Sequence, residues 1–154
     1  MRTFSLGAGK DTVVFAANAA ANGEDEITGF TAGAGGDVLD LSNFAAAAGV
    51  LQKADSTTGY LTLDNDGNSI GIFYNDTDGT ISSSNVKNSS SNAGDIIVGD
   101  GKKAVVLVTT GDAGTTASNT YNVYYVTGTN SGGTTELVGT VTTDNVVLTL
   151  DNFA

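Results

Sequence analysis

Short apolar runs separated by polar and glycine-rich connections dominate the pattern along this chain. Most runs are rich in β-branched residues, which favour strands. Tyr121–Tyr125 alternates in the manner of a half-buried antiparallel strand, whereas the uniformly apolar Val105–Val108 predicts a strand at the centre of a sheet. The predicted strands are Thr12–Phe15, Gly59–Leu63, Ser69–Tyr74, Lys103–Thr109, Tyr121–Thr127, Glu136–Thr142 and Val146–Leu150.

This spacing of strands and turns predicts an all-β fold, a sandwich or a roll, and not alternating βαβ units. One short helix is expected at Asn43–Ala48, with Ser42 as its N-cap. No linker interrupts the chain, so we expect a single domain over residues 1–154. Within it, residues 1–50 carry glycine–aspartate loops and short strands, and residues 55–154 carry longer antiparallel strands and hairpins.

The charge balance excludes several kinds of partner. The chain has 17 acidic and 6 basic residues and a formal net charge of −11. Such a field repels nucleic acid and acidic lipid headgroups, so we expect neither nucleic-acid binding nor membrane insertion. The apolar tract from Phe44 to Val50 is too short for a signal-peptide core or a membrane span. If the protein is exported, it leaves without a cleaved amino-terminal signal, or that signal lies outside this sequence.

The residue types also argue against catalysis. The chain contains no histidine and no cysteine, which removes Ser-His-Asp and Cys-His nucleophile systems and imidazole zinc sites. A carboxylate pair of the glycosidase kind remains formally available, but there is no tryptophan to form a sugar platform. We therefore expect a protein that is not an enzyme, and one whose rigidity does not come from disulfides.

Most of the acidic residues are aspartates. Only Glu24, Glu26 and Glu136 are glutamates, and most of the aspartates lie beside Gly, Asn or Thr. A short carboxylate in a glycine-rich loop can serve as a turn acceptor or reach a cation. Both explanations, turn chemistry with solubility and a bound ion, remain open at this point.

One spacing in the first zone favours an ion. Gly7-Ala8-Gly9-Lys10-Asp11-Thr12-Val13-Val14 fits the pattern G-x-G-x-D-x-U-x, in which U is a large apolar residue, and residues 33–40 fit it again. Glycine permits positive φ, which lets the loop turn its carbonyls toward one centre. Calcium takes six to eight oxygens, so one such turn needs a neighbouring turn to complete the shell.

These residues resemble a known family. The run from Gly7 to Phe15, then Asp25-Glu26-Ile27-Thr28-Gly29-Phe30, then Asp37-Val38-Leu39-Asp40-Leu41-Ser42, resembles the end of RTX β-rolls and the cap of the serralysin-type carboxyl-terminal domain. The resemblance covers roughly the first 45 residues. Leu6 and Ala32 replace the first glycine of each repeat, and Gly29 replaces a usual aspartate.

The resemblance implies a short calcium-binding, parallel β-roll edge that merges into the antiparallel zone. Calcium is then the expected cofactor. The implied ligands are the side chains of Asp11, Asp25, Asp37 and Asp40, with carbonyls near Gly7, Gly9, Gly33 and Gly35.

Two later loops are weaker calcium candidates. Asp64 and Asp66 open a loop like an EF-hand, and Asp76 and Asp78 open another, but neither has the glutamate that such a loop needs at its twelfth position. The first loop is better explained as a tight hairpin turn that joins a strand at Tyr60–Leu63 to one at Ile70–Tyr74.

The carboxyl end, Val146 to Ala154, resembles the uncleaved signals of type I secretion substrates. Together these likenesses imply an extracellular or cell-surface structural module that folds on calcium after passing the type I secretion machinery. We expect it to assemble with itself into a surface layer, filament or matrix. The alternatives are a calcium-dependent adhesin that binds surface glycans, and the carboxyl-terminal cap and secretion signal of a larger enzyme.

Overall fold

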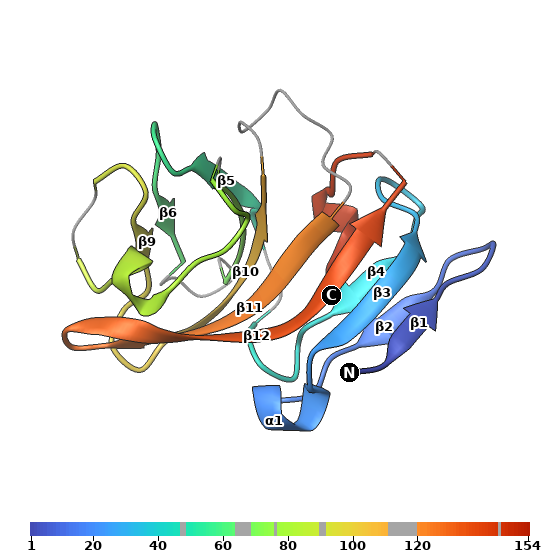
Figure 1. Ribbon diagram of the computed structural model, residues 1–154, viewed down its shortest axis with the longest axis horizontal. Helices are drawn as coiled ribbons and strands as arrows, with labels where there is room; N and C mark the ends of the chain where they lie inside the picture. The colour runs from blue at the N-terminus through green and yellow to red at the C-terminus, as the bar shows by residue number, and fades with distance from the viewer. Residues whose placement is uncertain (47–48, 64–68, 76, 90–91, 111–119, 145) are drawn as a thin grey trace.

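The structure is a computed structural model, and it describes residues 1–46, 49–63, 69–75, 77–89, 92–110, 120–144 and 146–154. The all-β prediction is confirmed, and the one α-helix in these ranges has four residues (Figure 1). The strands are β1 (Thr3–Ser5), β2 (Thr12–Val14), β3 (Asp25–Phe30), β4 (Val38–Asp40), β5 (Gln52–Asp55), β6 (Leu61–Thr62), β7 (Ile70–Tyr74), β8 (Val86–Lys87), β9 (Ile96–Ile97), β10 (Lys103–Thr109), β11 (Thr120–Thr129) and β12 (Gly132–Thr143). The helix is α1 (Ala19–Asn22), and Ser83–Asn85 and Leu150–Asn152 form 3₁₀ turns.

A seven-stranded sheet in the order β1-β3-β12-β11-β10-β7-β5 forms the middle of the molecule. All its strands run in one direction except β11, which pairs antiparallel with both β10 and β12. Small parallel sheets, β2-β4 and β6-β9-β8, complete the fold.

The two small sheets cover opposite faces of the central sheet. Along β10, Val105 and Leu107 join the core that contains β4, whereas Ala104 and Val106 join the core that contains β6 and β9. A strand covered on both faces has no polar side, which explains the uniform apolar run at Val105–Val108.

The chain winds inward from both edges of the central sheet. β1 to β4 alternate between the central sheet and the β2-β4 sheet. From β5 to β10 the chain passes between the central sheet (β5, β7, β10) and the other small sheet (β6, then β8 and β9). Parallel connections strongly prefer one hand. If two series of such connections have the same hand and start from opposite edges of a sheet, their connecting segments must lie on opposite faces of that sheet. The β2-β4 and β6-β9-β8 sheets lie on opposite faces in this way.

The helix lies in a different place from the one predicted. α1 begins after Asn18, whose side chain accepts the Ala21 amide, and ends at Gly23, whose φ is 69°. At the predicted position, the amides of Phe44 and Ala45 both donate to the Leu41 carbonyl in a single turn, and residues 47–48 lie outside the described ranges. Burial of Phe44 and Ala45 in the core overrides the helical propensity of the alanines there.

Three further predictions need correction. β6 pairs with β9, and β7 pairs with β5 and β10, so these two strands form no hairpin. The zone from residue 55 onward is mixed, because antiparallel pairing is confined to β10–β12 among its described strands. Residues 146–149 form no strand, and Leu150 begins a 3₁₀ turn. The first two errors replaced long-range parallel pairing with local antiparallel pairing. Within the described ranges, no helix is long and apolar enough to cross a membrane.

Candidate functional site

The two glycine–aspartate turns predicted from the sequence lie side by side. One turn joins β1 to β2 and ends at Asp11, and the other joins β3 to β4 and ends at Asp37. β2 and β4 pair in parallel with Thr12 opposite Val38. The Val38 amide donates to the Asp11 carbonyl at 2.9 Å. The stacking that the motif requires is therefore present for this pair of turns.

Close backbone packing explains one glycine of the second turn. A Cβ atom on Gly36 would lie 2.2 Å from the Thr31 carbonyl oxygen, so a side chain cannot be accommodated there without movement of the backbone. Gly33 and Gly35 of the same turn have φ values of 88° and 78°, which glycine adopts readily.

The Asp37 carboxylate is the centre of this site. The side chain is fully buried. Its Oδ1 accepts the Asp11 amide at 2.7 Å, and its Oδ2 accepts the Thr31 amide, also at 2.7 Å. The carboxylate thus joins the first turn to the residue that follows β3. These two bonds use about half of the roughly four lone-pair sites of a carboxylate.

Asn152 fastens the carboxyl end of the chain to the second turn, a role that the sequence did not suggest. Its side chain is fully buried. Its Oδ1 accepts the Gly33 amide at 2.9 Å, and its Nδ2 donates to the carbonyls of Gly33 and Asp37 at 3.2 and 2.9 Å. The Ala154 amide donates to the Leu39 carbonyl, and the Leu41 amide donates to the Ala154 carbonyl, which continues this contact past the end of β4.

The other two predicted aspartate ligands lie apart from Asp11 and Asp37. Asp25 begins β3 in the central sheet, and its Oδ1 accepts the Arg2 amide at 2.9 Å. Asp40 lies at the far end of β4, and its Oδ1 accepts the amide and the hydroxyl of Ser42 at 3.0 and 2.5 Å. Within the described ranges no three acidic side chains lie close enough to share an ion.

The backbone carbonyls predicted as calcium ligands belong to two separate turns. Gly33 and Gly35 belong to the turn that Asp37 closes, and Gly7 and Gly9 belong to the exposed turn before Asp11. A Cβ on Gly7, Gly9 or Gly35 would meet no atom within 4 Å, so these three positions border open space.

Of the weaker candidates, only Asp78 lies in the described ranges; Asp64, Asp66 and Asp76 lie outside them. The Asp78 Oδ1 is exposed and accepts the amide and the hydroxyl of Thr80 at 3.0 and 2.8 Å. Asn75 Nδ2 donates to the same oxygen at 3.2 Å. The described part of this loop is thus a hydrogen-bonded turn.

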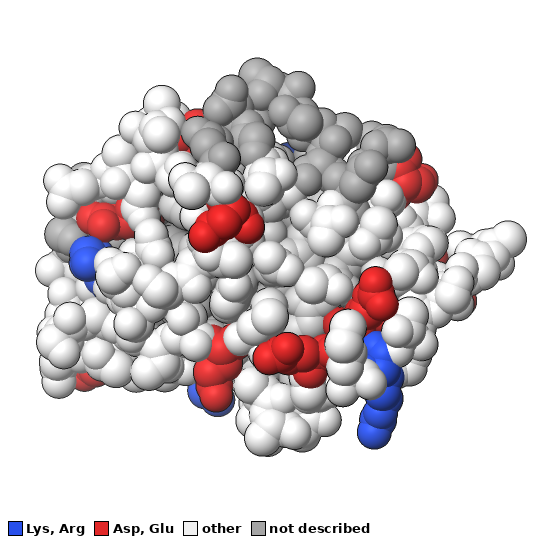
Figure 2. Space-filling model, in the orientation of Figure 1, with Lys and Arg blue, Asp and Glu red and all other residues white. Residues whose placement is uncertain are grey.

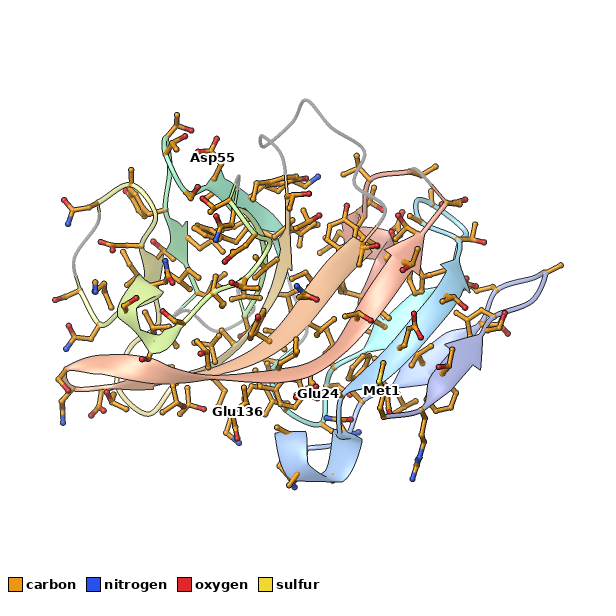
Figure 3. All side chains as sticks on the ribbon, in the orientation of Figure 1. Met1, Glu24, Asp55 and Glu136 are labelled. Atoms are coloured by element: carbon orange, nitrogen blue, oxygen red, sulfur yellow. The ribbon has the colours of Figure 1, made fainter. Side chains whose placement is uncertain are left out.

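Sequence reasoning also missed Asp55, which ends β5 and is labelled in Figure 3. It accepts four hydrogen bonds, from the amides and hydroxyls of Thr57 and Thr58, at 2.7–2.8 Å. These bonds, led by the one from the Thr57 amide, lower the pKa of the carboxyl group to about 2. The sequence Asp-Ser-Thr-Thr-Gly signals such a turn.

The acidic side chains on the face of the molecule that Figure 2 shows do not form one continuous patch. They lie scattered among uncharged residues, with few cations between them.

Compared with models of known protein families, with curated proteins and with solved structures, the chain matches none of them.

Proposed function

We propose that this chain is a calcium-stabilised structural module of an extracellular protein that assembles with itself and has no catalytic role. The observation that supports this most directly is the stacking of two glycine–aspartate turns, with the Asp37 carboxylate 2.7 Å from the Asp11 amide. This arrangement meets the requirement that one turn complete what its neighbour begins.

The residues of this site are compatible with a bound calcium ion. Asp37 keeps about two lone-pair sites. Asp11 is half-buried, and its carboxylate accepts no hydrogen bond from the part of the chain that the structure describes. Of the four predicted aspartate ligands, Asp11 therefore has the most ligand capacity to spare. Main-chain carbonyls and water would supply the remaining oxygens, and the ion would offset the repulsion between the two carboxylates.

Calcium stabilisation would also couple folding of the chain to its export from the cell. Calcium is scarce in the cytosol and near millimolar outside, so a site of modest affinity fills only after secretion. Type I machinery is the proposed route, on the likeness of residues 146–154 to the uncleaved signals of its substrates.

Thermal unfolding of the full chain in calcium and in EGTA tests the calcium part. For a dissociation constant near 10⁻⁴ M, calcium at about 1–10 mM adds roughly 1.4–2.7 kcal/mol of stability. At about 2–4 °C per kcal/mol this is a rise in Tm of roughly 3–11 °C.

Matched variants locate the effect. Asp11→Asn should remove most of the calcium-dependent rise and should leave the Tm in EGTA unchanged or slightly raised, because the repulsion between the two carboxylates is removed. Glu136→Gln removes an exposed carboxylate on β12, away from the turns, and should behave as wild type. An equal Tm for the wild type in calcium and EGTA would refute calcium stabilisation.

A further inference from the structure

One end of the molecule carries two strand edges that have no partner among the described strands. β1 is the last strand of the central sheet and pairs only with β3, and β2 pairs only with β4. Figure 1 shows both strands at the same end, with the turn between them projecting beyond the sheet. Proteins usually cover or blunt such edges, because the free backbone groups pair readily with another strand.

A cleft opens between these two edges. Its volume is about 360 Å³, and its apolar lining includes Phe4, Leu6, Val13, Val14, Phe15 and Ile27. Phe4 and Val14 are 42% and 61% exposed. The end of the core is therefore open to solvent where β1 and β2 part.

The backbone of β1 is set to pair on its open side. The Glu26 amide donates to the Arg2 carbonyl, and the Leu6 amide donates to the Thr28 carbonyl. Alternate residues of a strand direct their backbone groups to the same side. Arg2, Phe4 and Leu6 thus face β3, which leaves the amides and carbonyls of Thr3 and Ser5 directed to the open edge.

We propose that this end binds a second copy of the chain about a two-fold axis perpendicular to the central sheet. Such an axis sets β1 antiparallel to the partner copy's β1 and keeps both β2-β4 sheets on the same side. Thr3 of each copy then pairs with Ser5 of the other through backbone hydrogen bonds. The two copies of Phe4 meet at the axis, and the two clefts close on each other.

Charge complementarity favours the antiparallel arrangement. Lys10 is exposed in the projecting turn that follows β1. Asp25 and Glu26 lie at the opposite end of β1, where the Asp25 carboxylate accepts the Arg2 amide and the Glu26 carboxylate accepts the Thr3 hydroxyl. These two acids outnumber the one cation that β1 brings to this end, Arg2. An antiparallel partner brings its Lys10 toward these acids, and the contact occurs twice.

The area of the proposed interface determines the affinity that we expect for the dimer. The β1 ladder from Arg2 to Leu6 is five residues long, or about 17 Å at about 3.4 Å each, and two layers of about 10 Å each give a width of about 20 Å. The face therefore covers roughly 350 Å² per copy. Standard stable interfaces bury about 800 Å² per partner. We therefore expect a weak dimer that forms at micromolar or higher concentrations. The proposal rests on the assembly part of the proposed function and not on calcium.

Sedimentation velocity of the full chain, from about 10 µM to about 1 mM, tests the proposal. The wild type should shift from monomer to dimer over this range, and Phe4→Glu should raise the dissociation constant at least about tenfold. Tyr60→Glu is the matched control, because Tyr60 is 48% exposed but lies beside β6; its dissociation constant should stay within about twofold. Ser5→Lys, an exposed edge substitution, replaces Phe4→Glu if that variant loses the wild-type unfolding transition.

A cross-link tests the register. Antiparallel residues that face each other without backbone bonds have Cα atoms about 4.5 Å apart, within the range of a disulfide. The chain has no cysteine, so Phe4→Cys should give covalent dimers on mild oxidation and Tyr60→Cys should not.

A wild type that stays monomeric up to about 1 mM, or a dimer that Phe4→Glu leaves intact, overturns the proposal. Repeating the measurements in EGTA separates the two ideas, because molecular mass tests the dimer and Tm tests calcium stabilisation.

Discussion

Replacement of Asp37 by alanine should destabilise the protein strongly, through two amides that lose their acceptor. The amides of Asp11 and Thr31 each donate to this carboxylate at 2.7 Å. A buried donor left without a partner costs about 1–3 kcal/mol. Both bonds are only partly buried, so water reaches the freed amides in part and about 1–2 kcal/mol each is appropriate. The expected loss is about 2–4 kcal/mol of a total stability of about 5–15 kcal/mol.

Chemical and thermal unfolding in EGTA measure this loss without a contribution from calcium. At about 2–4 °C per kcal/mol, Tm should fall by roughly 4–16 °C. Asp37→Asn keeps one acceptor oxygen and should lose about half as much. Glu136→Ala, an exposed change on β12, should stay within about 0.5 kcal/mol. If Asp37→Ala lost less than about 1 kcal/mol, the carboxylate would not be the link between the two turns.

Three further changes probe other contacts by unfolding. Asn152→Ala should cost about 2–3 kcal/mol, because Gly33 loses an acceptor and two carbonyls lose a donor; a wild-type midpoint in urea would contradict this. Gly36→Ala should lower Tm, since the added Cβ meets the Thr31 carbonyl, and a wild-type melt would show that the turn yields freely. The Asp55 pKa is lowered to about 2, so its contribution is present above pH 4 and is lost as pH falls through 2. The stability difference between wild type and Asp55→Asn should therefore shrink over that interval, and a constant difference would exclude this linkage.

Strands with a long apolar or alternating run of their own were predictable from the sequence. The run Lys103–Thr109 is β10 with the predicted bounds, and β11 extends the predicted Tyr121–Thr127 by one residue at its start and two at its end. β1 and β9, of three and two residues, were not predicted. Such short strands exist because a distant parallel neighbour pairs with them, and a local pattern cannot report that neighbour.

The candidate site was predictable only in part, for a similar reason. The glycine–aspartate spacing correctly indicated two turns that stack, because glycine and aspartate have local conformational roles. Asn152 lies 119 residues from Gly33 along the chain, and nothing near it in sequence marks it as a partner of that turn. The family resemblance implied Asp25 and Asp40 as ligands too, yet the winding of the chain puts Asp25 in another sheet and Asp40 at the other end of β4.

The excess of aspartate over glutamate has a structural explanation that narrows the calcium hypothesis. A short carboxylate can accept amides from its own turn or from an adjacent strand, whereas glutamate is less suited to this. Backbone amides donate to the carboxylates of Asp25, Asp37, Asp40, Asp55, Asp78, Asp95 and Asp144. The carboxylates of these seven aspartates therefore have a structural role, accepting backbone amides, that requires no metal. Asp11 occupies a motif position and accepts no such bond from the described residues, so Asp11 is where calcium dependence is best tested.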